Sequence, residues 1–256
     1  MNNVTPQTSA RPEPPAAKAP DWAACAVFLD FDGTLAPFCD QPDAVALPAR
    51  ERRAVQTLLD RCDGAVAIVT GRALSDIARL TEGLPLVLAG SHGLELRWPD
   101  GTTEVPDDVA AVLDAPHERL ADFAATHGLL IERKPGAIAL HYRTAPDKGD
   151  AVRAATEDAA KGNDDLRVIH GNMVSEVALS SIDKGSALAR LMQLAPFAGR
   201  TPVMVGDDRT DEDGITEAQA LGGTGIRIGD PDSPAHIHFA DREGFCDWLS
   251  SSLEVV

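Results

Sequence analysis

Cysteine is scarce in this sequence of 256 residues. The four cysteines, Cys25, Cys39, Cys62 and Cys246, show no Cys-x-x-Cys spacing. That spacing would indicate a metal or redox site, so its absence argues against a cysteine-based centre. Because most of these cysteines stand among apolar residues, we expect reduced core thiols in a cytoplasmic protein.

Histidine pairs with metal-site partners are also lacking. His236 and His238 flank one residue as a metal pair could, but no carboxylate or cysteine accompanies them at ligand spacing. We therefore expect them to line one face of a strand.

Positive charge is in short supply. The chain has 23 lysines and arginines against 40 aspartates and glutamates, a formal net charge of -17. This charge opposes nucleic acid and anionic membranes as partners, and it repels an anionic substrate at long range. An anionic substrate must therefore be attracted by local positive charge. We infer no obligate protein partner.

The first residues lack a long apolar run. Residues 1–20 are rich in Pro, Ala and Thr, without the hydrophobic stretch of a signal peptide or a membrane helix. We expect residues 1–21 to form a disordered leader. The rest of the chain suits one large domain and one smaller domain, and it leaves no room for a fused glycosyltransferase.

An acidic turn at the end of an apolar strand is the most informative feature present. Asp30 and Asp32 close the strand and precede Gly33, and strand alternation puts both carboxylates on one side. Such a pair needs a divalent cation, and oxygen ligands favour magnesium over zinc. Asp30 could then act as a nucleophile and Asp32 could carry a proton to a leaving oxygen. The alternative is an acidic turn at a strand end that has no catalytic role.

Three later segments add candidate phosphate ligands. An apolar strand ends at Thr70, whose hydroxyl and following N–H groups could hold a phosphate. Lys184 opens an amphipathic helix and could also contact a phosphate. The alternative is an ordinary surface lysine, which is the more usual case for an isolated lysine. The strand 203–205 leads into the acidic run Gly206–Asp213, which places further carboxylates at a strand end.

Strands and helices alternate in two stretches, residues 22–103 and 181–256. This alternation predicts an α/β core with a doubly wound parallel sheet. Ligands of such sheets bind beyond the carboxyl ends of the strands, where Asp30, Thr70 and Asp207 all fall. We therefore expect a single site.

The segment between these stretches has a different pattern. Residues 104–180 read as two repeats of helix and hairpin, with helices expected over 107–127 and 147–161. The pattern predicts an inserted α+β cap domain, a small sheet with both helices on one face. Its open face is expected to carry six polar side chains: Glu132, Lys134, His141, Arg143, Asn172 and Glu176. The alternative is an ordinary exposed sheet face.

The order of these motifs resembles the haloacid dehalogenase superfamily of phosphotransferases and, within it, the trehalose-6-phosphate phosphatase family. Five stretches carry the resemblance: Leu29–Leu35, Val69–Arg72, Gly90–Glu95, Asp183–Gly185 and Gly206–Glu212. It runs from about Trp22 to the last helix. One departure lies after Glu176, where the family often has Arg-Pro and this chain has Val177–Ser181.

The resemblance implies hydrolysis of trehalose 6-phosphate to trehalose and phosphate, the last step of trehalose biosynthesis, with Mg²⁺ as cofactor. It implies that Asp30 is the nucleophile and Asp32 the acid and base, while Thr70 and Lys184 hold the phosphoryl group. The implied metal ligands are Asp30, Asp207 and the main-chain carbonyl of Asp32. Asp208 and Asp211 are expected to orient Lys184 or metal-bound water. The implied substrate-binding residues are Gly71, Arg72, Ser91, His92 and Gly93 of the core, and Lys134, His141, Arg143, Asn172 and Glu176 of the cap.

Two alternatives stay open. Another phosphatase or a phosphomutase of the same superfamily could share every core residue, and only the cap face would distinguish it. A catalytically silent sugar-phosphate sensor would be expected to lack Asp30 or Asp32, and both are present. Gly90–Gly93 together with Glu176 favours trehalose 6-phosphate as the substrate.

Overall fold

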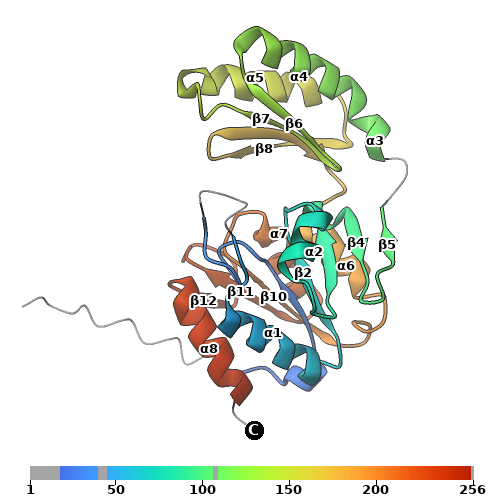
Figure 1. Ribbon diagram of the computed structural model, residues 1–256, viewed down its shortest axis with the longest axis vertical. Helices are drawn as coiled ribbons and strands as arrows, with labels where there is room; N and C mark the ends of the chain where they lie inside the picture. The colour runs from blue at the N-terminus through green and yellow to red at the C-terminus, as the bar shows by residue number, and fades with distance from the viewer. Residues whose placement is uncertain (1–17, 40–44, 106–108, 255–256) are drawn as a thin grey trace, which may run out of the picture.

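The computed structural model describes residues 18–39, 45–105 and 109–254, which form two β-sheets with helices packed on them (Figure 1). Most of the expected leader, residues 1–21, lies outside the described residues. No helix among those described is both long enough and apolar enough to cross a membrane.

Eight strands form the larger sheet. Their order is β12 (Ile237–Phe239), β11 (Thr224–Ile228), β10 (Thr201–Gly206), β1 (Cys25–Leu29), β2 (Val66–Val69), β3 (Val87–Gly90), β4 (Glu95–Arg97) and β5 (Thr103–Glu104). All strands from β12 to β3 run parallel, whereas β4 and β5 are antiparallel. Every residue of β1 and β2 is buried, so the sheet is covered on both faces. The predicted α/β core with a parallel central sheet is confirmed.

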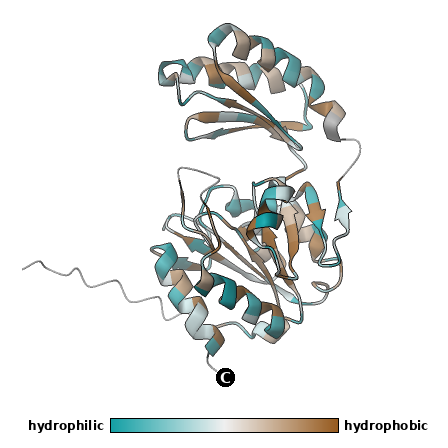
Figure 2. Cartoon of the chain, in the orientation of Figure 1, coloured by the Kyte–Doolittle hydropathy of each residue, from teal (hydrophilic) through white to brown (hydrophobic). Residues whose placement is uncertain are grey.

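Helices cover this sheet. They are α1 (Ala49–Arg61), α2 (Leu74–Leu80), α6 (Lys184–Leu191), α7 (Asp211–Ala220) and α8 (Arg242–Glu254), and a short 3-10 helix (Trp22–Ala24) precedes β1. Helices α1 and α8 contact each other in front of the sheet in Figure 1, and α6 packs against α7. Figure 2 shows apolar residues along the central strands and polar residues on the outer helix faces.

Four antiparallel strands form the smaller sheet. Their order is β6 (Leu130–Lys134), β7 (Ala137–His141), β9 (Val174–Leu179) and β8 (Leu166–Gly171). Helices α4 (Asp114–His127) and α5 (Gly149–Ala160) cover the face away from the larger sheet, and Ile138 and Val177 are buried beneath them (Figure 1). The other face of the small sheet is turned toward the larger one.

Two sequence expectations are corrected in detail. The helix expected over 107–127 is divided into α3 (Val109–Val112) and α4, because Pro116 has no N–H to bond back to the carbonyl of Val112. The second helix begins as a 3-10 turn (Pro146–Lys148) before α5. The hairpin of β4 and β5 was not anticipated, since strands of two or three residues show no readable alternation.

The cysteines are unpaired, and three of them are core residues. Cys25, Cys62 and Cys246 are buried, and burial raises the pKa of the Cys25 thiol to about 11 and of the other two to about 12. Cys39 is exposed, so the expectation of a core thiol is wrong at that position. Of the two histidines, His238 lies in β12, while His236 directly precedes that strand.

Candidate active site

Three parallel strands of the larger sheet end at neighbouring points, and each is followed by a polar side chain. Asp30 follows β1, Thr70 follows β2 and Asp207 follows β10. The backbone continues the strand pairing at these positions, because the N–H of Asp30 donates to the carbonyl of Val205 at 2.9 Å. The parallel arrangement therefore brings these side chains to one edge of the sheet.

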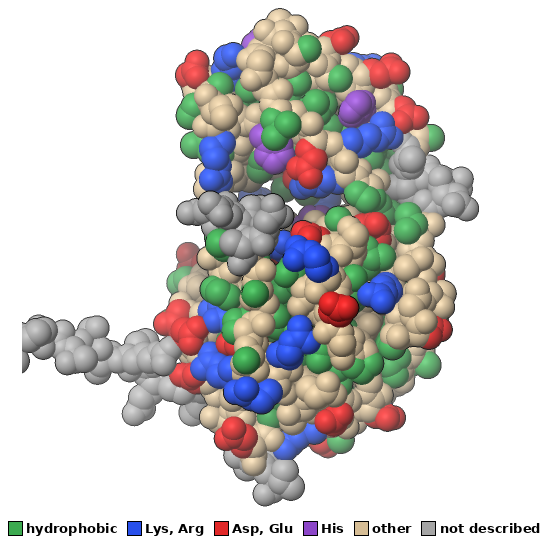
Figure 3. Space-filling view, in the orientation of Figure 1, with side chains coloured by type: hydrophobic (Ala, Val, Ile, Leu, Met, Phe, Trp, Pro, Cys, Tyr) green, Lys and Arg blue, Asp and Glu red, His purple; other side chains and the backbone are tan. Residues whose placement is uncertain are grey.

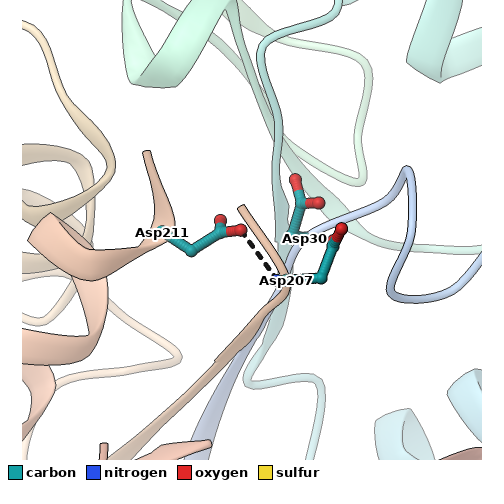
Figure 4. Close-up of side chains that lie close together, drawn as sticks. All are labelled: Asp30, Asp207 and Asp211. Atoms are coloured by element: carbon teal, nitrogen blue, oxygen red, sulfur yellow. Dashed lines mark hydrogen bonds between the residues drawn. The ribbon is translucent and has the colours of Figure 1, made fainter. Parts of the chain in front are cut away.

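Three carboxylates converge there. Asp30, Asp207 and Asp211 each have an oxygen within 4.8 Å of the others, and Figure 4 shows Asp30 and Asp207 side by side with Asp211 pointing toward them from α7. Asp211 also accepts the backbone N–H groups of Asp207 and Asp208 at 3.0 and 2.8 Å. The start of α7 is thereby attached to the strand end that carries Asp207.

A buried lysine lies among these carboxylates. Lys184 Nζ donates to Asp30 Oδ1 at 2.6 Å and to Asp211 Oδ1 at 2.5 Å. Burial alone would lower the pKa of Lys184, but the charges of Asp30 and Asp211 raise it, so the ammonium keeps its proton. Helix α6 begins at Lys184 because Asp183 caps it, and Ser186 completes a reciprocal capping box.

The carboxylate cluster fits a divalent cation such as magnesium. Burial, followed by the charge of Asp211, raises the pKa of Asp30 well above its usual range and that of Asp207 to about 6. Three carboxylates therefore share a buried place with one ammonium group, that of Lys184. Carboxylate oxygens are the ligands that magnesium prefers, and Thr34 Oγ1 fixes Asp207 by donating to Oδ1 at 3.0 Å.

Gly33 is required by the close approach of Asp207. It has a φ of +81°, and a Cβ built there would lie 2.1 Å from Asp207 Oδ2. Gly33→Ala should therefore push Asp207 aside and lower the catalytic activity of this site by about 100-fold, as expected for an ångström-scale misplacement. Magnesium titration by calorimetry should show weaker binding.

Gly64 supplies the matched control. Its φ is +79°, but a Cβ there meets nothing within 4 Å. Gly64→Ala carries the same backbone penalty, about 1–2 kcal/mol, without touching the site. If both variants lose activity and magnesium affinity equally, the contact with Asp207 does not explain the glycine.

Asp32 does not point at the carboxylate cluster. Its two oxygens accept hydrogen bonds from Arg72 Nε at 2.6 Å and Arg72 Nη2 at 2.7 Å. This bidentate pairing raises the pKa of the Arg72 guanidinium, which also contacts Asp76 at 3.2 Å. Any part that Asp32 takes in metal binding therefore falls to its main-chain carbonyl. The pairing of Arg72 with Asp32 was not anticipated from the sequence.

Asp208 and Asp211 differ in what they touch. Asp211 contacts Lys184 directly, as expected of a residue that orients it. The side chain of Asp208 instead accepts the backbone N–H of Arg209 at 2.6 Å, and its carbonyl accepts a hydrogen bond from Arg227. In this arrangement Asp208 organises the loop before α7 rather than Lys184.

A small cavity of about 20 Å³ lies where the two sheets meet. It is lined by Gly71, Ser91, His92, Lys134, Gly136, Ala137, Arg167, Glu176, Ala178 and Ile182. A volume of this size holds about one water molecule, so a sugar phosphate must extend into the surrounding hollow or displace the cap. Figure 3 shows the molecule hollowed between its two parts, with basic and histidine side chains deep in the gap.

His92 lines this cavity from the core side. The His92 ring lies against Gly71, where an added Cβ would come within 2.8 Å of the ring. The backbone N–H of His92 donates to the carbonyl of Thr70 at 2.8 Å. Burial and the charge of Lys184 lower the pKa of His92 to about 4, so its ring is neutral at physiological pH. The preceding Ser91 donates to Glu95 at 2.8 Å, and the following Gly93 packs on Ala187.

Two polar pairs mark the open face of the small sheet. Lys134 Nζ donates to Glu176 Oε1 at 2.6 Å, and His141 Nε2 lies 3.0 Å from Glu132 Oε2. The register places these residues on one face, because Ala139 of β7 stands opposite both Glu132 and Glu176.

Arg143 and Asn172, which were also expected on this face, lie outside the strands that form it. Strand β7 ends at His141, and the chain turns at Arg143 toward Pro146. Asn172 lies in the tight turn between β8 and β9, next to Met173 with its φ of +61°. Both side chains are exposed, and the alternation that predicted their direction applies only within a strand.

The sequence of this chain is similar to those of known proteins. The family model of the trehalose-phosphatases matches residues 28–234, which include all the strand-end carboxylates. The chain belongs to the trehalose-phosphatase family. It is 39% identical over 212 residues to a probable trehalose-phosphate phosphatase of Sinorhizobium fredii, an alignment that covers 82% of this chain and 79% of that protein. It is 35% identical over 240 residues to the trehalose-6-phosphate phosphatase of Escherichia coli, covering 92% and 89%.

Solved structures share the fold of this chain. The C-terminal domain of the C. albicans trehalose-6-phosphate phosphatase superposes with a TM-score of 0.73 at 20% identity, covering 91% of this chain and 92% of that one. A haloacid dehalogenase-like hydrolase from B. subtilis superposes with a TM-score of 0.64 at 15% identity, covering 90% and 100%. At such identities the likeness concerns the fold alone. The match to the trehalose-phosphatase family identifies the protein as a phosphatase.

Sequence reasoning missed two residues of the site region. Thr34, which holds Asp207, stands within the first motif but was not singled out. Arg167 lines the cavity from β8, and the alternation of β8 with Ile169 on the same face could have indicated it.

Proposed function

We propose that this phosphatase hydrolyses trehalose 6-phosphate to trehalose and phosphate, the last step of trehalose biosynthesis, in a magnesium-dependent reaction through an aspartyl-phosphate on Asp30. The observation that carries the proposal is the buried contact of Lys184 with Asp30 and Asp211, beside Asp207, at the strand ends of a trehalose-phosphatase family chain. A carboxylate so placed could act as a nucleophile, with Lys184 and a cation held by the neighbouring carboxylates to offset the charge of a phosphoryl group.

In the first step an Asp30 oxygen attacks phosphorus and the bond from phosphorus to the sugar oxygen breaks. Lys184 and Thr70 hold the phosphoryl oxygens, and Asp32 gives its proton to the leaving sugar oxygen. Asp30, Asp207 and the main-chain carbonyl of Asp32 would hold Mg²⁺, which supplies positive charge against the phosphoryl oxygens.

In the second step water attacks the phosphorus of the aspartyl-phosphate. Asp32 takes the proton of that water, the bond between phosphorus and Asp30 breaks, and inorganic phosphate is released. For both proton transfers Asp32 must leave its bidentate pairing with Arg72. Arg72 therefore serves Asp32 in this proposal, rather than binding substrate as the family resemblance implied.

The cap is proposed to recognise the sugar. Lys134, Glu176 and neutral His92 surround the cavity between cap and core, so a sugar bound at this place would meet an anion, a cation and an uncharged imidazole. Movement of the cap would admit the substrate and then exclude bulk water.

Phosphate release from a panel of sugar phosphates, with magnesium and with a chelator, tests the proposal. We expect a clear preference for trehalose 6-phosphate and loss of activity when magnesium is removed. Equal rates on glucose 6-phosphate and trehalose 6-phosphate would point to a general sugar phosphatase. Transfer of the phosphoryl group to a second sugar position would point to a phosphomutase.

Glu176→Ala should lower kcat/KM for trehalose 6-phosphate by about tenfold or more, because a charge-assisted hydrogen bond of roughly 1.5–3 kcal/mol is lost. The variant also leaves Lys134 without its 2.6 Å partner. Hydrolysis of a small aryl phosphate, which does not reach the cap, should change little.

The matched control is Glu157→Ala, which removes a carboxylate from the outer cap helix where it contacts His170. This variant should hydrolyse both esters like the wild type. If Glu176→Ala slows both esters in parallel, Glu176 supports the scaffold and does not read the sugar.

A further inference from the structure

Arg167 reaches from the cap to the part of the core that carries Lys184. It is the second residue of β8, opposite Ala178, and its Nη2 donates to the carbonyl of Ile182 at 2.8 Å. Its Nη1 lies 3.5 Å from Asp213 Oδ2 and 4.0 Å from Asp183 Oδ2. One guanidinium thus contacts the connection between β9 and α6, the N-cap residue of α6 and the first turn of α7.

These contacts end one or two residues from the catalytic groups. Ile182 and Asp183 directly precede Lys184, and Asp213 stands two residues after Asp211. The two helix starts are packed closely, because a Cβ at Gly185 would come within 2.7 Å of the carbonyl of Asp213. Arg167 therefore contacts the backbone and side chains next to Lys184 and Asp211.

Arg167 also borders the cavity where the proposed substrate sugar would lie. Its Nε is buried and has no hydrogen-bond partner among the described residues, and the guanidinium is close enough to His92 to lower the pKa of that ring. A planar guanidinium that borders the cavity and also contacts the connection before α6 and the first turn of α7 can transmit the position of a ligand or of the cap.

We propose that Arg167 is a positioning residue, which couples the position of the cap to the placement of Lys184 at the phosphoryl site. This inference rests on the proposed function for the chemistry of Lys184. It assigns a cap residue to phosphoryl transfer rather than to sugar recognition.

Arg167→Met tests the coupling by separating kcat from KM. We expect kcat to fall about tenfold for both trehalose 6-phosphate and a small aryl phosphate, with KM for the aryl ester nearly unchanged, since misaligned catalytic groups lower kcat. Arg167→Lys, which keeps a cation and a single donor, should recover part of the loss. Arg153→Met, an exposed arginine on α5, is the matched control and should behave as wild type.

A double-mutant cycle with Asp213→Ala provides the second measurement. The two substitutions should be less than additive in kcat, because they break the same contact. If Arg167→Met raises only KM for the sugar ester, Arg167 is a sugar contact and the inference fails. It also fails if kcat for the aryl ester stays at the wild-type value. The wild-type preference for trehalose 6-phosphate tests the proposed function separately, since the aryl assay needs no sugar.

Discussion

Asp30→Asn should lower hydrolysis of every phosphate ester by several orders of magnitude, because an amide oxygen cannot replace the attacking carboxylate. The substitution keeps the shape of the side chain, and Lys184 retains its 2.5 Å contact with Asp211. Steady-state phosphate release measures the loss. Radiolabelled substrate should leave no acid-stable label on the variant, whereas the native enzyme should be labelled in the presence of magnesium.

Stability distinguishes this result from simple unfolding. A raised pKa means that the folded chain disfavours the charged form of Asp30, so removing that charge should leave the Tm of the metal-free protein unchanged or higher. Fluoroberyllate, which mimics the aspartyl-phosphate, should inhibit the native enzyme only with magnesium. Turnover of Asp30→Asn near the wild-type rate would remove Asp30 as the nucleophile.

The parallel core could be predicted because its signals are local and strong. Buried strands such as β1 and β2 are continuous apolar runs, and each is followed by a polar residue. Once the strands are taken as parallel, their carboxyl ends must share an edge, so the proximity of Asp30, Thr70 and Asp207 follows from the strand order. That order, with β10 and β2 on either side of β1, is a long-range pairing that only the structure supplies.

The partners of the charged residues could not be predicted in the same way. Arg72 lies 40 positions from Asp32, and no pattern in either segment says that their side chains meet. In the cap, the alternation located Lys134 and Glu176 on one face but failed where the strands stopped. Arg143 and Asn172 lie in turns just beyond the ends of the strands. Alternation no longer predicts the direction of a side chain there.

Asp32→Asn should affect the two classes of ester differently. A sugar oxygen needs a proton to leave, so hydrolysis of trehalose 6-phosphate should fall by about 10²–10⁴-fold, the usual contribution of a general acid. The aryl oxygen of a nitrophenyl phosphate leaves without a proton, so attack by Asp30 should continue. The second step still needs a base, and the phosphorylated enzyme should therefore accumulate.

A burst experiment separates these steps. Mixing Asp32→Asn with nitrophenyl phosphate should release about one nitrophenolate per enzyme molecule, followed by slow turnover, whereas trehalose 6-phosphate should give no burst. Asp76→Asn is the control, since it also removes a carboxylate partner of Arg72 but lies on α2 away from the cluster. That variant should keep fast turnover on both esters. Equal losses of Asp32→Asn on both esters, without a burst, would mean that Asp32 only anchors Arg72 and the turn at Gly33, and the proton would have to come from another group.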